Sequence, residues 1–364
     1  MIKQLKTFTI NMVAGANIVT VILMLSAGYS DRINPVEHPV LACFGMTFPI
    51  FLFCNLLFLF FWLTFKWRKI WIPVVGYLLA YFPLSIYMPI NMRQEVPEDA
   101  IKLLSYNVCS YGGNYKYEHG FDTVYNYLKR QNADIVCLQE DCDSWRRYVF
   151  IRYEKIYPYN DTTVFYNDAR GMNAVGIHTR FPIIRKERIP YHSNENGSVA
   201  YFLNTGHDTL LVINNHLEGT HLSYKDRANY ERMLHGKMEK DTAKQESLLL
   251  LEKLGKAAAK RAPEAEAVHR YIEEHSQYPV IVCGDFNDNP ISYSRRTIAE
   301  GLTDCFVTTG RGVGLSYNQK GFYFRIDHIL CSPDIQPFNC QIDDEMDASD
   351  HFPIICWLKM KDKP

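Results

Sequence analysis

The sequence predicts an α/β sandwich preceded by apolar helices that span a membrane. The first 97 residues carry only 7 basic and 3 acidic side chains, whereas the later residues form short apolar runs separated by polar turns, and several of these runs end in acids, amides or imidazoles. With 364 residues, 47% apolar and 22% charged, the chain is neither disordered nor fibrous, and its net charge of −1 excludes a strongly basic nucleic-acid-binding protein. We therefore divide it into a membrane anchor, residues 1–97, and a large domain, residues 98–364.

Three segments of the anchor contain no Asp, Glu, Lys or Arg. They are 24, 28 and 23 residues long, and a bilayer core needs about 20 apolar residues. They predict transmembrane helices over about 8–28, 41–65 and 70–90. The third contains prolines, which a membrane helix tolerates when its neighbours satisfy the freed backbone groups. Three such segments in succession argue against core helices of a soluble protein.

Basic residues set the expected orientation. Lys3 and Lys6 precede the first span, and Lys66, Arg68 and Lys69 follow the second. The positive-inside rule then places both regions in the cytoplasm and the large domain on the extracytoplasmic side, facing the periplasm if the cell is bacterial. The first segment could instead be a cleaved signal peptide, and the large domain would still end outside.

The large domain reads as strands with helices between some of them. Strand length, β-branched content and bounding turns mark residues 101–107, 135–139, 162–166, 174–179, 198–204, 210–215, 280–283, 325–330 and 353–358. Helical spacing marks residues 121–131 and a long stretch, 224–275, in which Pro263 is the clear interruption. This pattern indicates an α/β sandwich rather than an all-β barrel.

Polar residues gather at the ends of these predicted strands, where α/β sheets commonly bind ligands. The ends carry Asn107, Glu140, His216, Asp285, Asn287, Asp327, Asp350 and His351. Carboxylate and amide oxygens without thiolates favour Mg²⁺ or Mn²⁺ over a structural zinc ion. Such a cation polarises a phosphoryl oxygen, and a histidine oriented by a carboxylate takes a proton from water. The residues therefore suit the hydrolysis of a phosphate ester.

The same runs resemble, in order and character, the motifs of the endonuclease/exonuclease/phosphatase family. The matching runs are Asn107, Leu138-Gln139-Glu140, Asn214-Asn215-His216, Gly284-Asp285-Phe286-Asn287, Arg325-Ile326-Asp327-His328 and Ser349-Asp350-His351. The resemblance covers everything after the spans. It implies a four-layer α/β/β/α sandwich of the DNase I-like kind and a phosphoesterase that depends on Mg²⁺ or Mn²⁺. His216 is similar to the residue used by the DNase I and neutral sphingomyelinase branch.

The resemblance also implies how the metal and the base are held. Glu140 is the expected principal metal ligand, with Asn107 beside it and Asp350 near the metal. His351 is the expected base, oriented by Asp327.

The remaining matched residues are expected to handle the phosphate. Asp285 and Asn287 would align the nucleophile and hold the phosphate, and His216 would stabilise or protonate the phosphoryl group. Arg325 shares the strand face of Asp327 by the two-residue period, so it either binds the substrate phosphate or forms an ion pair. His328 faces the opposite side and is expected to be structural.

The expected partners are the membrane and a phosphate mono- or diester: a lipid head group, a nucleotide or a nucleic acid. No protein partner is inferred. The large domain has a net charge of −5, which argues against a broad nuclease, and tethering favours membrane-proximal esters. An extracytoplasmic DNA or RNA endonuclease is the alternative within the class. A non-catalytic receptor or scaffold is disfavoured because every matched position is present. No disulfide pairing is assigned among the ten cysteines, because connectivity cannot be read from the sequence.

Overall fold

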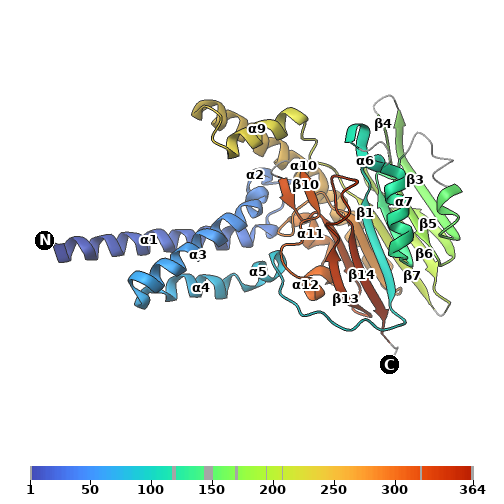
Figure 1. Cartoon of the computed structure of the whole chain (residues 1–364), viewed down its shortest axis with the longest axis horizontal. Helices are drawn as coiled ribbons and strands as arrows, with labels where there is room; N and C mark the ends of the chain where they lie inside the picture. The colour runs from blue at the N-terminus through green and yellow to red at the C-terminus, as the bar shows by residue number, and fades with distance from the viewer. Residues whose placement is uncertain are drawn as a thin grey trace.

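A computed structural model describes residues 2–116, 120–142, 151–168, 171–193, 195–206, 208–319 and 322–361. Apolar helices form one end of the molecule and a two-sheet sandwich forms the other (Figure 1). The helical end comprises α1 (Ile2–Gly28), η1 (Ser30–Arg32), α2 (Pro39–Ala42), η2 (Cys43–Thr47), α3 (Phe48–Phe65), η3 (Trp67–Lys69), α4 (Trp71–Leu79) and α5 (Tyr81–Tyr87).

Two helical stretches, Gln4–Arg32 and Pro39–Phe65, are long and apolar enough to cross a membrane. Buried amides join them: Asn17 donates to Asn55 at 3.0 Å, and the indole of Trp62 donates to Asn17 at 2.8 Å. Such hydrogen bonds between helices stabilise packing where the surroundings offer no water. The polar residues within the first two segments therefore connect α1 to α3.

The third predicted span is not one continuous helix. It is divided into α4 and α5, which meet at an angle of 64°. Pro83 lacks the N–H that would bond to the carbonyl of Leu79 four residues earlier, and that carbonyl accepts a hydrogen bond from the hydroxyl of Tyr29 at 2.7 Å instead. The proline thus explains the bend, and Tyr29 satisfies the backbone group that it frees.

The sandwich contains two six-stranded sheets. The first has the order β13-β14-β1-β2-β4-β3 and the second β5-β6-β7-β8-β12-β9, with a separate β10–β11 hairpin. The strands of the first sheet are β1 (Ile101–Asn107), β2 (Ile135–Gln139), β3 (Tyr159–Asp168), β4 (Gly171–Thr179), β13 (Ile335–Ile342) and β14 (Ile354–Met360). Those of the second are β5 (Ile183–Arg188), β6 (Gly197–Asn204), β7 (Thr209–His216), β8 (Val280–Asp285), β9 (Thr303–Asp304) and β12 (Asp327–Cys331), and the hairpin is β10 (Tyr317–Gln319) with β11 (Phe322–Phe324).

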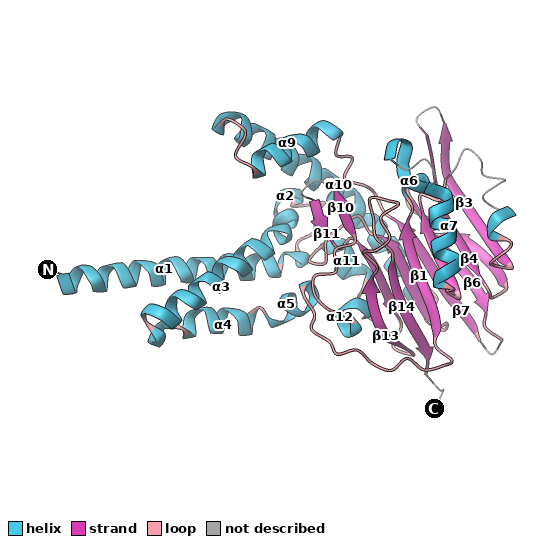
Figure 2. Ribbon diagram, viewed as in Figure 1, coloured by secondary structure: helices cyan, strands magenta, loops and turns pink. Residues whose placement is uncertain are grey.

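Each sheet is buried on both faces, and this produces four layers (Figure 2). Alternate residues point to opposite faces of a strand: Leu103 packs between the sheets, whereas Leu104 packs towards α7 (Gly120–Gln131). The outer face of the second sheet packs on the C-terminal half of α10 (Lys240–Glu274), which contributes Val268. The predicted α/β/β/α sandwich is therefore confirmed. The remaining short helices are α6 (Cys109–Lys116), α11 (Tyr293–Ile298) and α12 (Cys305–Thr309).

The predicted helical stretch between β7 and β8 forms α9 (Tyr224–Leu234) and α10. Ser223 and Asp226 form a capping box that starts α9. The prediction that Pro263 interrupts the stretch is wrong, because α10 continues through it. Ala262 and Ala265 beside the proline are fully buried, and this packing outweighs the roughly 3 kcal/mol that an internal proline costs.

The helical end is packed directly on the sandwich. A Cβ added to Gly45 would lie 2.3 Å from the carbonyl oxygen of Ile291, and one added to Gly255 would lie 3.0 Å from the backbone of Pro39. These glycines allow η2 to approach the loop after β8, and α10 to approach α2. Asn91 also donates to the backbone of α12 and of Gly310. The joint is therefore a packed interface rather than a loose tether.

Candidate active site

The sheet topology brings the polar strand ends together. β1 and β2 are parallel, with Asn107 opposite Gln139, so Glu140 leaves the sheet beside Asn107. In the second sheet, His216 is opposite Asp285, which is in turn opposite Asp327 on the antiparallel strand β12. All these residues therefore reach the same edge of the sandwich.

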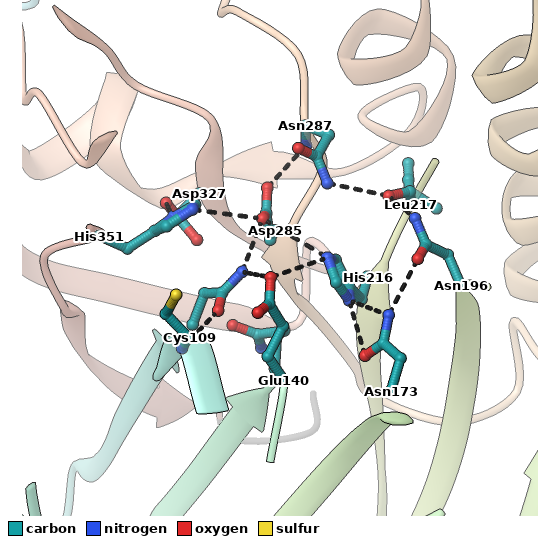
Figure 3. A network of polar contacts seen from close by, with 12 residues as sticks. Cys109, Glu140, Asn173, Asn196, His216, Leu217, Asp285, Asn287, Asp327 and His351 are labelled. Carbon is teal, nitrogen blue, oxygen red and sulfur yellow. Dashed lines mark hydrogen bonds and ion pairs between the residues drawn. The ribbon is translucent and has the colours of Figure 1, made fainter. Parts of the chain in front are cut away.

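Glu140 adopts a left-handed backbone conformation, with φ of 51°. This conformation costs about 1 kcal/mol or more for a residue other than glycine. Backbone N–H groups of Cys142 and Ser110 both donate to its carbonyl, at 2.7 and 3.2 Å. Asn107 fixes the side chain, since its amide nitrogen donates to Glu140 at 3.2 Å and to Asp285 at 3.0 Å. Glu140 and Asp285 thereby belong to one network of polar contacts (Figure 3). The amide oxygen of Asn107 accepts from the N–H of Cys109.

Negative charges are crowded at this end of the site. Burial and the nearby charge of Asp350 raise the pKa of Glu140 to about 7. Burial likewise raises the pKa of Asp285. Carboxylates this close to one another repel, and a bound cation would remove that repulsion.

His351 and Asp327 form a hydrogen-bonded pair. Nδ1 of His351 lies 2.8 Å from a carboxylate oxygen of Asp327, and Nε2 lies 3.6 Å from Asp285. Burial alone would lower the pKa of His351, but the charges of Asp327 and Asp285 outweigh it and raise this pKa to about 10. Ser316 fixes the dyad from behind by accepting the N–H of Asp327.

His216 has the opposite electrostatic character. Its Nδ1 lies 3.1 Å from the amide nitrogen of Asn173, and its Nε2 lies 3.9 Å from Glu140 and 3.8 Å from Asp285. Burial lowers the pKa of His216. Burial thus dominates the pKa of His216, whereas neighbouring carboxylates dominate that of His351, and this difference suits distinct roles for the two histidines.

Asn287 follows β8 in a left-handed conformation, with φ of 52°, which asparagine adopts readily. Its backbone N–H donates to Asp285 at 2.7 Å, and its side-chain nitrogen donates to the carbonyl of Leu217 at 2.9 Å. These bonds fix both Asn287 and the carboxylate of Asp285.

A cavity of about 310 Å³ opens over these side chains. Six residues predicted from the sequence line it: Glu140, His216, Asp285, Asn287, Asp350 and His351. Asn107 and Asp327 are buried behind this lining and contact it through the hydrogen bonds described above. The structure thus brings together eight of the nine predicted site residues.

The ninth, Arg325, lies elsewhere, so the prediction that it binds substrate is corrected. Its side chain is buried, and its guanidinium donates to the carbonyls of Val313 and of Ile86 in α5 while stacking over Phe306. It connects the sandwich to the helical end. The structural assignment of His328 agrees with its position, since it is buried against Phe286.

Several lining residues were not predicted from the sequence. Arg227 in α9 is the sole Lys or Arg among the described residues around the cavity. Its guanidinium lies 6.0 Å from the ring of Tyr317, which in turn packs edge-on against His351. Asn173 in β4 holds His216. No local motif marks these positions, because their role arises from contacts between distant segments.

The donor set fits a hard divalent cation. Glu140, Asp350 and Asp285 offer carboxylate oxygens to one cavity, and such oxygens are the preferred ligands of Mg²⁺ and Mn²⁺. Ligand atoms of Asp285, Asp327 and His351 also lie within 4.8 Å of one another. Asp327 and His351 are already hydrogen-bonded to each other. Asp285 is therefore the residue of this group that best suits a cation ligand.

Two family models match the sequence. The model of the Endonuclease/Exonuclease/phosphatase family matches residues 104–351, and a Domain of unknown function (DUF8431) matches residues 10–87. None of the curated proteins compared with the chain matches it in sequence.

Solved structures share the fold of the sandwich. D. rerio TDP2 complexed with single strand DNA product is 16% identical, with a TM-score of 0.51 over 72% of this chain and 100% of that one. The human Nocturnin catalytic domain with bound sulfate is 13% identical, with a TM-score of 0.51 over 75% and 96%. Sphingomyelinase C from Streptomyces griseocarneus is 16% identical, with a TM-score of 0.50 over 71% and 99%. With its sandwich, its convergent strand ends and a family match over residues 104–351, the chain belongs to the endonuclease/exonuclease/phosphatase family.

Proposed function

We propose that this protein is a membrane-anchored, divalent-cation-dependent phosphoesterase that hydrolyses phosphate mono- or diesters outside the cytoplasm. One observation carries the proposal: the His351–Asp327 pair, with its 2.8 Å hydrogen bond, faces the same cavity as Glu140 and Asp285. This combines a positioned proton acceptor with a cluster of hard oxygen ligands. Water would attack the phosphorus in line with the departing alcohol.

Glu140 and Asp350 would hold Mg²⁺ or Mn²⁺, with Asn107 positioning Glu140 through its amide nitrogen. A bound divalent cation supplies Lewis acidity to a phosphoryl oxygen, and its charge lowers the pKa of the nearby His351. Burial, together with the nearby charge of Asp350, raises the pKa of Glu140 to about 7, and the repulsion between the carboxylates favours cation binding.

Proton transfer is assigned to His351, and stabilisation of the phosphoryl oxygen is assigned to His216. His351 uses Nε2 to take the proton of the attacking water, while Asp327 holds Nδ1 and keeps the ring in place. In His216, Nδ1 accepts from the amide of Asn173, and Nε2 then donates towards the phosphoryl oxygen. Such positioned acid–base groups contribute roughly 10²–10⁴-fold to a rate.

The test uses the full chain in detergent with bis-p-nitrophenyl phosphate. We expect hydrolysis with Mg²⁺ or Mn²⁺, its loss on adding EDTA, and its recovery when excess cation is restored. Glu140→Gln should lower the rate by at least about 10²-fold, whereas Glu273→Gln, an exposed change on α10, should not alter it. Full activity in EDTA or in Glu140→Gln would contradict the proposed mechanism.

The extracytoplasmic orientation rests on the positive-inside rule. The basic segment η3 and the N-terminus both lie at the end of the helices that points away from the sandwich (Figure 1). A membrane-impermeant maleimide applied to intact cells should label Lys237→Cys in the large domain and leave Arg68→Cys unlabelled, with the unmodified chain giving the background. The reverse pattern would contradict this orientation.

A further inference from the structure

The wall of the cavity includes the outer end of the anchor. Met46 of η2 lines it together with Leu254 of α10 and Arg227 of α9. The apolar helix α3 begins at Phe48, two residues after Met46. The cavity therefore borders the end of a helix that is apolar enough to lie in a bilayer.

The distance between this cavity and the anchor is fixed by packing. Gly45 contacts the backbone of Ile291, in the loop that follows Asp285 and Asn287, and Gly255 contacts Pro39. Arg296 also lies 3.8 Å from Asp31 across the same joint. A catalytic domain on a flexible tether samples many distances from the bilayer, whereas this joint holds the cavity at one height.

A helical arm, residues 224–256, extends from the sandwich on the side of the anchor helices (Figure 1). Leu234, Leu248 and Leu249 on this arm are 58, 59 and 52% exposed. Val40 and Leu41 of α2, which packs against α10, are also more than half exposed. Exposed apolar side chains are thus present both on the arm and on the anchor helix that packs against α10. An exposed apolar surface of this kind, next to membrane-spanning helices, suits the bilayer interface.

The charge of the arm also suits contact with the bilayer surface. Residues 224–256 contain eight Lys or Arg and six Asp or Glu, although the large domain as a whole has a net charge of −5. Basic side chains near a bilayer are attracted to anionic lipids, by about 1 kcal/mol each close to the surface. The arm therefore carries a small positive excess that suits contact with an anionic bilayer surface.

From these observations we infer that the arm lies on the bilayer surface and that the substrate is a phospholipid of the same membrane. The inference rests on the phosphoesterase function proposed above. The head-group phosphate would enter beside Arg227, while the apolar wall of Met46 and Leu254 faces the lipid. The oxygen of water forms the new bond to phosphorus, and the bond between phosphorus and the departing alkoxide breaks. Neutral His351 takes the water proton and later returns it to solvent, and the alkoxide takes a proton from solvent.

The experiment uses the full chain reconstituted into vesicles of equal parts phosphatidylethanolamine and phosphatidylglycerol, with traces of phosphatidylcholine and sphingomyelin. Lipid products and water-soluble phosphate esters are measured by mass spectrometry, and bis-p-nitrophenyl phosphate is assayed in the same vesicles. We expect hydrolysis of at least one lipid. The double variant Leu248→Asp, Leu249→Asp should lower it at least about tenfold because charged side chains weaken interfacial binding, and should leave cleavage of the soluble diester within about twofold.

Ile184→Asp is the matched control, since Ile184 is 56% exposed on the edge strand β5 and is not in the arm. It should change neither activity. Cleavage of bis-p-nitrophenyl phosphate without cleavage of any lipid would overturn the inference and leave the proposed function intact. Equal lipid hydrolysis by the double variant and the unmodified chain, or preferential cleavage of a single-stranded oligonucleotide, would also overturn it. Failure to cleave the soluble diester with Mg²⁺ or Mn²⁺ would instead overturn the proposed function itself.

Discussion

The active site and the joint between anchor and sandwich both bury polar side chains, but those of the joint are hydrogen-bonded to backbone groups whereas carboxylates of the active site lie close to one another. In the joint, the guanidinium of Arg325 meets two backbone carbonyls, and Asn91 meets two more. In the active site, Glu140 lies near Asp350, and the repulsion contributes to its raised pKa. Hydrogen-bonded polar groups stabilise an interface, whereas crowded like charges cost stability and support the proposed cation site. Changes in the joint should therefore affect stability, and changes in the active site should affect catalysis.

The largest expected effect follows from removing the proposed base. His351→Ala should lower kcat on bis-p-nitrophenyl phosphate by about 10²–10⁴-fold, because no other side chain of the described residues takes its place beside the carboxylate of Asp327. His269→Ala, a change on α10 outside the cavity lining, should keep the rate within about twofold. Initial rates at saturating substrate measure both, and a rate loss below tenfold in His351→Ala would show that another residue is the base.

Asp327→Asn should lower the rate less and should shift its pH dependence. The carboxylate charge of Asp327 raises the pKa of His351, so its removal lowers that pKa and leaves the imidazole neutral at lower pH. The rising acidic limb of kcat against pH should therefore move to lower pH, while the loss of orientation reduces the plateau by roughly 10²-fold. An unchanged limb would mean that His351 does not control it.

Arg227→Ala tests the contribution of the arm to the cavity. A charge-assisted hydrogen bond is worth about 1.5–3 kcal/mol, so kcat/KM should fall by about 10- to 100-fold. Arg227→Lys should restore part of this loss, because it keeps the charge but not the planar fork. Arg232→Ala, on the same helix and outside the cavity lining, is the control. Equal kcat/KM values for Arg227→Ala and Arg232→Ala would remove Arg227 from the site.

Arg325→Met should have the smallest catalytic effect and should affect stability instead. It leaves the carbonyls of Ile86 and Val313 without their donor, at a cost of about 1–3 kcal/mol each when buried. The thermal unfolding midpoint, followed by circular dichroism in detergent, should fall, while hydrolysis of the soluble diester at low temperature stays within about twofold. Arg93→Met, a change in the exposed linker, should not shift the midpoint. A loss of activity greater than about twofold without a fall in the unfolding midpoint would indicate that Arg325 acts in the active site.

The sequence was sufficient to predict the central strands and most of the site, and it failed where local pattern and tertiary context differ. β1 and β2 were predicted with their observed bounds, because β2 is an apolar run buried throughout and β1 is buried from its third residue to its end. β5 and β13 were not predicted. Both are edge strands: β5 carries a mixed charged run from Arg185 to Arg188, and β13 contains Pro337, which an edge strand tolerates.

The misassigned site residue has a similar explanation. Arg325 shares a two-residue period with Asp327, but β12 begins only at Asp327, so the strand period does not extend back to Arg325. Arg227 could not be found from sequence because its approach to Tyr317 depends on the path of the arm over the sandwich. Strand-end motifs are local and can therefore be predicted from sequence, whereas the contacts of the arm depend on the tertiary structure and cannot.

The close contact at Gly45 has a practical consequence for anyone who wishes to study the sandwich by itself. Excising residues 1–97 would expose the buried Ile291, which lies in the same loop as Asn287, and would remove the carbonyl of Ile86 from Arg325. Such a fragment would lose the packing contacts that the helical end contributes to the stability of the sandwich. Purification strategies for this enzyme should keep the anchor attached and choose the detergent accordingly.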